Sequence, residues 1–413
     1  MTTSTLVSAD STGGEHQRWR IVAALAITST VGYGTLYYAY AVLLRPMATS
    51  LDASTTAVTG ALTASVLAGA LMAIPIGRWL DRHGGRALMT AGSITATALL
   101  VAWSQVQTIG QLYAVMTGIG ITGAMVLYEP AFAVIVSWFT PDRRPTALLA
   151  VTIVAGFAST IFMPLTGLLI AHLGWRTTLL ALAAIHGLLT VPLHALTIRT
   201  PPPPAAPTAA ALSDRTQRRA AARTATHDPR FWILTAALIA HGAATSTIAV
   251  HLIGYLTSRG HPATFAATAT GLLGVLSVTG RLVLTAARRH LPVTTIVATV
   301  FAVQAAAVLA LPFTGGSRIG AVITVTGFGI GFGIAHLATP ALLTDRYGTA
   351  AYATIAGRLA APVTIARATA PLGAAAILHT GGGYLLLLGA VGACCVLAAT
   401  GMLVRSATPV PPA

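Results

Sequence analysis

The feature that most constrains this chain is a succession of apolar runs, each about as long as a lipid bilayer is thick. A helix needs about 20 predominantly apolar residues to cross the hydrocarbon core. The stretch between Arg86 and Glu129 contains no charged residue and is too long for one crossing, and the polar segment 104–111 provides a turn within it. The runs predict about twelve membrane-spanning helices, at residues 21–44, 54–77, 87–104, 111–138, 145–171, 177–197, 231–256, 263–285, 293–313, 319–343, 350–378 and 383–404.

The composition excludes a water-soluble globular protein. Of the 413 residues, 55% are hydrophobic and only 8% are charged, whereas a soluble domain carries about 25% charged residues. A net charge of +15 would suggest nucleic-acid binding in a soluble protein. Here the basic residues are all arginine and lie between apolar runs without interleaved aromatic residues. We therefore expect a lipid bilayer around the protein and no nucleic-acid partner.

The segment 198–230 differs from the rest of the chain. It contains Pro201–Pro204, which is stiff and cannot be helical, and then a cluster of arginines that cannot enter lipid cheaply. The sequence therefore predicts an all-α integral membrane protein of twelve transmembrane helices in two bundles. The expected domains are an N-terminal six-helix bundle at 1–197, a cytoplasmic linker at 198–230 and a C-terminal six-helix bundle at 231–413.

The distribution of arginine between the loops predicts the orientation. Cytoplasmic loops of membrane proteins carry an excess of basic residues. Most arginines lie in the segments on one side of the predicted spans, and the loops on the other side hold only Arg45, Arg176, Arg259 and Arg318. We expect a multi-pass protein of the cell (plasma) membrane with both termini cytoplasmic, acting as a monomer. Residues 1–17 lack the pattern of a signal peptide and resemble a short cytoplasmic tail.

The segment that follows the second span reads Gly77-Arg-Trp-Leu-Asp81-Arg82-His-Gly84-Gly-Arg86. It resembles the signature G-x-x-x-D-R-x-G-x-R of the major facilitator superfamily, which lies between spans two and three on the cytoplasmic side. The resemblance implies secondary transport by alternating access, with these five residues in a gate. Asp81, at a helix end, could pair with an arginine or with the positive N-terminus of a neighbouring helix. The alternative is an ordinary charged turn that only sets the topology.

A narrower resemblance runs through residues 128–180. Trp138-Phe139, Arg143-Arg144 and Gly174-Trp175-Arg176 are similar to motifs of the monocarboxylate transporter and oxalate–formate antiporter branch, and Asp345-Arg346-Tyr347-Gly348 also fits. This resemblance implies a small organic anion as substrate. The second-half copy of the loop signature, around Arg288, lacks the Asp-Arg pair, so we expect any inner latch to be asymmetric.

Arginines inside predicted spans mark a candidate central site, because an ionisable group in a span costs about 3 kcal/mol or more unless it is paired or wetted. In the branch just named, span eight carries an arginine that meets the substrate carboxylate, and Arg281 falls at that place. A rival register would put Arg281 nearer the cytoplasmic rim. Arg367, near the middle of span eleven, is either a second anion contact or a partner for Glu129 or another buried group. Arg358, near the cytoplasmic end of that span, is expected to snorkel.

Glu129 is the carboxylate that we expect within a span, somewhat past the middle of span four. Three roles are open: a proton carrier, a fixed anion that neutralises Arg281 or Arg367, and a direct contact to substrate. Its neighbour Tyr128 occupies a place where the branch offers a substrate-contacting tyrosine.

Span one contains Tyr33, Tyr37 and Tyr40 at helical spacing, which predicts that they share one face. Their hydroxyl groups need partners, so Tyr33 and Tyr37 are candidate substrate contacts, and the alternative for this face is an interfacial aromatic belt. His241 and His336 could titrate in a cavity, although packing is the simpler interpretation for each.

The chain contains no metal-ligand spacing of histidines, no catalytic elbow, no Walker-type loop and no dinucleotide fingerprint. We expect neither an enzyme nor a bound metal or cofactor, and an ion or substrate gradient as the energy source.

These observations predict a secondary active transporter of a small organic anion, with a monocarboxylate as the first candidate, coupled to protons or to exchange. A first alternative is proton-driven efflux of a cationic or lipophilic compound, with Glu129 as the acid. A second alternative is a membrane receptor without transport activity. The charge around Arg281 and Arg367 distinguishes the first two, because arginines tied to Glu129 would favour the efflux alternative.

Overall fold

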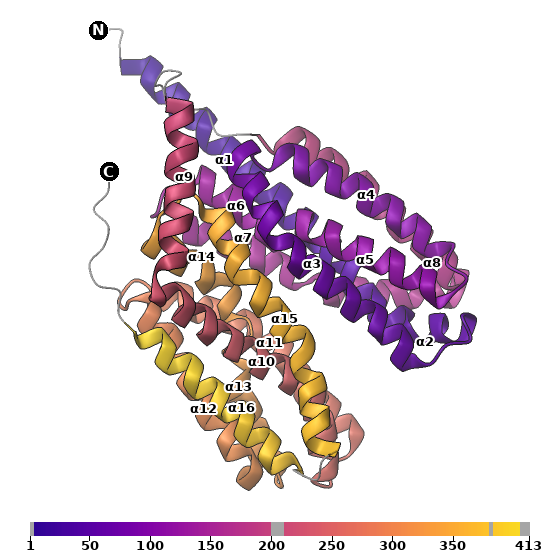
Figure 1. Ribbon diagram of the computed structural model, residues 1–413. Helices are drawn as coiled ribbons and strands as arrows, with labels where there is room; N and C mark the ends of the chain where they lie inside the picture. Colours follow the sequence, from indigo (N-terminus) through magenta and orange to yellow (C-terminus); the bar gives the residue numbers. More distant parts are fainter. Residues whose placement is uncertain (1–3, 200–209, 380–382, 405–413) are drawn as a thin grey trace. The chain divides into compact units, whose positions relative to one another are not determined.

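The computed structural model describes residues 4–199, 210–379 and 383–404. Every regular element in these ranges is a helix, and the predicted all-helical membrane fold is confirmed (Figure 1). The proline run Pro201–Pro204 of the predicted linker and residues 380–382, between the last two predicted spans, lie outside the described residues.

Eleven helices in the described ranges are long and apolar enough to cross a membrane. The longest, Arg144–Thr197, has 54 residues, more than twice the length of about 20 that a bilayer requires. Gly174 breaks it with a φ of 73° and a ψ of 165°, values that no helical residue adopts. This segment therefore holds both spans predicted at 145–171 and 177–197.

The chain folds into two compact units. Unit 1 comprises Met1–Gln217 with Thr349–Gly357, and unit 2 comprises Arg218–Gly348 with Arg358–Ala413. The division after Gln217 falls inside the segment predicted as a linker. Much of that segment forms a polar helix, α9 (Ala210–His227), which the sequence analysis did not anticipate.

Unit 1 is built around helices that pack α3 on α5, α4 on α8, and α1 on α7 and α8. Tyr40 and Trp103 are fully buried in its core, with ring centroids 5.5 Å apart. Its elements are α1 (Ser4–Tyr33), the π-helix η1 (Gly34–Tyr38), α2 (Ala39–Ser50), α3 (Thr55–His83), α4 (Arg86–Ser104), α5 (Ile109–Val126), α6 (Tyr128–Trp138), α7 (Arg144–Gly156) and α8 (Ala158–Thr197).

Unit 2 packs α12 on α16 and α13, α10 on α16, and α11 on α13. Its elements are α10 (Pro229–Ser258), α11 (Ala263–Ala287), α12 (Val293–Thr314), α13 (Arg318–Gly329), α14 (Ile334–Tyr347) and α16 (Gly383–Leu403). The helix α15 (Tyr352–His379) begins among the residues of unit 1 and continues among those of unit 2.

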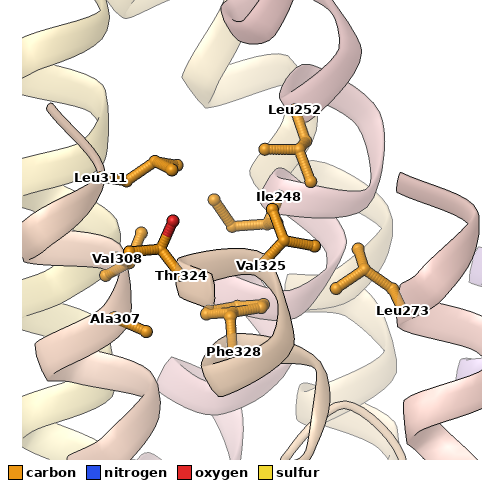
Figure 2. Close-up of a pocket in the computed structure, with 9 residues that line it drawn as sticks. All are labelled: Ile248, Leu252, Leu273, Ala307, Val308, Leu311, Thr324, Val325 and Phe328. Atoms are coloured by element: carbon orange, nitrogen blue, oxygen red, sulfur yellow. The ribbon is translucent and has the colours of Figure 1, made fainter. Parts of the chain in front are cut away.

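A small gap remains in the core of unit 2, between α10, α11, α12 and α13. Figure 2 shows its lining, in which the hydroxyl of Thr324 is the one polar group drawn among apolar side chains such as Leu252 and Phe328. Its volume is about 10 Å³, which is room for at most one water molecule. The gap is therefore a packing feature and is too small for a substrate.

Several loop arginines bind the carbonyl groups that helix ends leave without partners. Arg86 Nε donates to Ala195 O at 2.8 Å, and Arg176 Nη1 donates to Ser104 O at 2.8 Å. Because the last carbonyls of a helix have no partner within it, a guanidinium there satisfies them and favours the negative end of the helix dipole. These arginines thus have a structural role at the helix ends.

The guanidinium of Arg358 binds the polar helix α9. Its Nη1 donates to Ala222 O at 2.8 Å and to Thr226 Oγ1 at 2.9 Å. The segment predicted as a linker therefore provides acceptors for an arginine of α15.

Candidate functional site

Three predicted spans are irregular where the candidate site residues lie. Span one contains η1, span four breaks at Leu127 between α5 and α6, and span ten breaks at residues 330–333 between α13 and α14. Helix breaks and π-segments inside spans are frequent at functional sites, because they turn side chains out of the regular pattern and free backbone groups.

The carboxylate of Asp81, at the end of α3, accepts two backbone hydrogen bonds within unit 1. Ala353 N donates to Oδ1 at 3.0 Å and Thr354 N donates to Oδ2 at 2.7 Å. Both amides belong to the first turn of α15, where the amides have no partner inside the helix and the helix dipole is positive. Of the two kinds of partner considered for Asp81, the structure thus provides a helix N-terminus.

At two positions of the signature, the local backbone explains why the residue is glycine. A Cβ on Gly77 would collide with the backbone carbonyl of Ala353, so glycine lets α3 approach the start of α15 closely. Gly84 ends α3 with a φ of 73° and a ψ of −178°, a conformation that is almost exclusive to glycine. Arg82 is exposed, and Arg86 binds the end of α8 as described above.

The tyrosines of span one do not share one face. Tyr40 is fully buried and its hydroxyl donates to Val58 O, so it belongs to neither a cavity face nor an aromatic belt. The π-helix η1 causes the difference, because its wider turn shifts the residues after it relative to an α-helix. Tyr33 instead meets Tyr128, with ring centroids 4.7 Å apart, and Tyr128 stacks on Phe132 at 5.0 Å.

Tyr37 is 45% exposed and packs edge-on against Tyr38. The predicted substrate contacts of unit 1 therefore separate into a compact group of Tyr33 and Tyr128 and a more exposed Tyr37.

Glu129 is exposed and lies in the first turn of α6. Tyr352, at the start of α15, is within electrostatic range of Glu129, Arg144 and Asp81. Glu129 and Asp81 of the loop signature thus both lie within electrostatic range of the same side chain, that of Tyr352.

In unit 2, the structure brings together Arg281, Arg367 and His336. Arg367 Nη1 lies 3.3 Å from His336 Nε2, and His336 is also within electrostatic range of Arg281 and His241. Arg281 is 6% exposed, and Arg367 and His336 are half-buried. These four basic side chains come from α10, α11, α14 and α15, so the cluster exists only in the folded unit.

Glycines shape the space for the two guanidinium groups. A Cβ on Gly242 of α10 would lie 2.8 Å from Arg367 Cγ, and one on Gly333 would lie 3.0 Å from Arg281 Nε. Gly333 ends the break before α14, and its lack of a side chain lets Arg281 lie against the backbone there. Arg281 Nη2 also lies 3.4 Å from Ser277 Oγ.

No carboxylate side chain of unit 2 lies within its spans near this cluster. The sequence contains no Asp or Glu between Asp228 and Asp345, and none after Asp345. Asp228 caps α10 and accepts from Tyr347 Oη at 3.1 Å, at the far end of α14. Asp345 is about 13 Å along α14 from His336, at 1.5 Å per residue.

His336 is the member of the cluster that sequence reasoning undervalued. The signal was present, since the glycine-rich run 327–333 before it predicts a break in span ten. His241, by contrast, is buried and stacks on Phe301 at 4.1 Å, in keeping with the packing interpretation.

Membrane-crossing helices, breaks within spans and buried charged groups together define a polytopic membrane transport protein. Residues 24–371 match the family model of the Major Facilitator Superfamily, and the chain belongs to this superfamily.

Among curated proteins, the chain is similar to an MFS-type efflux pump of Mycolicibacterium smegmatis, with 30% identity over 175 residues. That stretch covers 42% of this chain and spans only 40% of the relative's length.

Among solved structures, the human organic anion transporter MFSD10 has a TM-score of 0.69 and 16% identity, over 93% of this chain and 99% of that one. The E. coli fucose:proton symporter has a TM-score of 0.73 and 13% identity, over 94% of this chain and 98% of that one. At these identities the likeness shows the fold alone.

Proposed function

We propose that this member of the superfamily is a secondary active transporter of a small organic anion, with a monocarboxylate as the first candidate. The observation that carries the proposal is the cluster of Arg281, Arg367 and His336, which gathers two guanidinium groups and an imidazole from three helices of unit 2. Like charges gathered in a partly buried place repel one another, and an anion bound between two guanidinium groups would relieve that repulsion.

The two guanidinium groups suit a carboxylate in particular. Each presents a planar fork of donors that can bind both oxygens of a carboxylate, and a partly buried setting strengthens such bonds. This chemistry supports the monocarboxylate and oxalate–formate branch that the motifs around Trp138 and Gly174 resemble. In unit 1, Tyr33, Tyr37 and Tyr128 are proposed as further substrate contacts, through ring stacking and hydroxyl groups.

The remaining parts of the proposal concern the transport cycle. The protein alternates between two states by movement of the two six-helix bundles predicted at 1–197 and 231–413, joined by the linker 198–230. It acts as a monomer in the plasma membrane with both termini cytoplasmic, and the loop signature at 77–86 forms part of its gate. Transport is coupled to protons or to exchange, and Glu129 and His336 are the candidates for carrying the proton.

Substitution of Arg281 tests the anion site. Arg281→Lys keeps the charge and loses the planar fork, so affinity for a carboxylate should fall about ten- to a hundredfold, the equivalent of one charge-assisted hydrogen bond of about 1.5–3 kcal/mol. Arg281→Ala should lower it further. The measurement is the affinity of the purified protein for lactate, formate and oxalate, with thermal stability as the folding control.

Arg259→Lys is a matched control. Arg259 belongs to the same unit, is exposed, and its Nη2 lies 3.4 Å from Pro312 O, outside the cluster. Its replacement should leave carboxylate affinity unchanged. Undiminished carboxylate binding in Arg281→Ala would refute the site assignment.

Proton-driven efflux of a cationic or lipophilic compound is the second candidate. The partial similarity to an efflux pump supports it, as does the aromatic group of Tyr33, Tyr128 and Phe132 beside the exposed Glu129. Aromatic faces and a carboxylate would suit an organic cation. Tight binding of a lipophilic cation that is insensitive to Arg281→Ala would favour this alternative.

A further inference from the structure

The second half of the helix α9 has one face packed on unit 2. Ala222 and Ala225 are buried on this face. Arg358 of α15 holds it through the hydrogen bonds to Ala222 O and Thr226 Oγ1 described above. Near the start of α10, Trp232 Nε1 donates to Thr226 O at 3.0 Å. The helix is therefore attached to α10 and α15, and its opposite face is turned away from them.

The opposite face of α9 is basic. Arg219, Arg223 and His227 are exposed and follow one another at intervals of four residues, so they lie along one stripe of the helix. Within α9, His227 Nδ1 donates to Arg223 O at 2.9 Å. The sequence contains no Asp or Glu from residue 215 to residue 227. A stripe of basic side chains without acidic ones attracts an anionic partner.

The length of α10 indicates where α9 lies relative to lipid. The helix α10 has 30 residues, which at 1.5 Å per residue is about 45 Å. This length matches the thickness of a bilayer with both headgroup layers, about 40–45 Å. The start of α10 therefore lies among headgroups, and α9 ends directly before it, with only Asp228 between them. Trp232, which is 52% exposed, agrees with this depth, because tryptophan is enriched at the membrane–water interface.

Two arginines at this depth suit the phosphate of a phospholipid. A guanidinium presents a planar fork of donors that can bind two phosphate oxygens. Side chains four residues apart on a helix start about 6 Å from one another, so Arg219 and Arg223 can reach the same headgroup. Near an anionic membrane surface, each arginine raises the affinity about fivefold.

We infer that the exposed face of α9 binds the headgroups of anionic phospholipids through Arg219 and Arg223, and so anchors this helix to the membrane surface. Charge complementarity and depth together select the lipid. The phosphate of an anionic lipid such as phosphatidylglycerol has no cation of its own, whereas phosphatidylcholine carries a quaternary ammonium that would repel the two guanidinium groups. The inference concerns no step of substrate binding, so it holds whichever compound the protein carries.

Quenching of tryptophan fluorescence by brominated lipid tests which lipids surround Trp232. The full-length protein is placed in nanodiscs of four parts phosphatidylcholine to one part phosphatidylglycerol, with bromine near the headgroup end of the acyl chains of one lipid or of the other. The difference between the unmodified protein and Trp232→Phe isolates the signal of Trp232. The quenching should show a preference for phosphatidylglycerol of about five- to thirtyfold, the contribution of one to two arginines.

Replacing both arginines of the stripe by glutamine, Arg219→Gln with Arg223→Gln, should remove this preference, because the charges are lost and polar side chains remain. The matched control is Arg259→Gln with Arg318→Gln, which removes two charges from exposed arginines of the same unit. Arg259 caps the other end of α10, and Arg318 lies two residues after Gly316, on which a Cβ would lie 3.4 Å from Arg259 Nη2. This control should keep the full preference.

Equal quenching of Trp232 by the two brominated lipids overturns the inference, and so does a preference that persists in Arg219→Gln with Arg223→Gln. Equal quenching together with tight binding of a poly-glutamate peptide would assign the face to an acidic protein partner instead. A preference that added glycerol phosphate abolishes would assign the arginines to a soluble phosphate, which also overturns the inference.

If the double glutamine variant fails to fold, salt decides with the unmodified protein. The preference for phosphatidylglycerol must disappear as the ionic strength rises, because salt screens exposed charges. A preference that salt leaves unchanged overturns the inference.

Discussion

Replacing Asp81 by asparagine separates the charge of the signature loop from its shape. The carboxylate accepts one backbone hydrogen bond at each oxygen, from Ala353 at 3.0 Å and from Thr354 at 2.7 Å. Asparagine has one acceptor oxygen, and its amide would point N–H groups at a backbone N–H. The variant therefore loses one charge-assisted hydrogen bond and the attraction between the charge and the N-terminus of α15.

The two losses have known magnitudes. A hydrogen bond to a charged group contributes about 1.5–3 kcal/mol, and a charge at a helix N-terminus contributes about 0.3–1 kcal/mol. Asp81 is half-buried, so solvent reduces both values. We take about 2 kcal/mol as the loss, which corresponds to a shift of about thirtyfold in the equilibrium between the bound and released first turn of α15.

Hydrogen exchange is the direct assay. The amides of Ala353 and Thr354 should exchange about thirtyfold faster in Asp81→Asn, because exchange follows the population of the open state. Transport in proteoliposomes should be slower, with folding and substrate affinity retained, because the proposed gate would close less firmly. Asp142→Asn is the matched control, since Asp142 is an exposed carboxylate in the turn before α7.

Unchanged exchange at both amides in Asp81→Asn would refute the claim that the carboxylate holds α15. Faster exchange with unchanged transport would leave the contact intact as a structural feature and refute its role in gating.

Two further predictions concern unit 1. Gly77→Ala should slow transport more than Asp81→Asn and lower the thermal stability, because its Cβ would collide with the carbonyl of Ala353; Gly110→Ala, where a Cβ meets nothing within 4 Å, should be neutral in both assays. Glu129→Gln should leave the pH dependence of anion binding unchanged, because Glu129 is an exposed residue in the first turn of α6 and the proposed anion site is formed by Arg281 and Arg367. If anion binding by this variant no longer depends on pH, Glu129 is the proton carrier and the prediction is refuted.

The sequence by itself determined the class of the fold. Apolar runs of bilayer length force helices, because lipid offers no partner to backbone amides and carbonyls. Some predicted bounds agree closely with the helices, as for 293–313 against Val293–Thr314, whereas the span predicted at 21–44 lies within the longer helical segment Glu15–Ser50. The signature at 77–86 also identified the superfamily correctly, since its glycines and charges are needed at fixed spacing for local reasons that the backbone at Gly84 makes plain.

Only the tertiary structure decided which side chains meet. Sequence spacing treats a span as a regular helix, and the π-segment Gly34–Tyr38 broke that assumption for Tyr40. The basic cluster depends on residues far apart in the chain, from His241 to Arg367, which no local pattern connects. The pattern of apolar residues predicts where the helices form. The packing of the helices, with glycines at the close contacts, decides which charged side chains become neighbours.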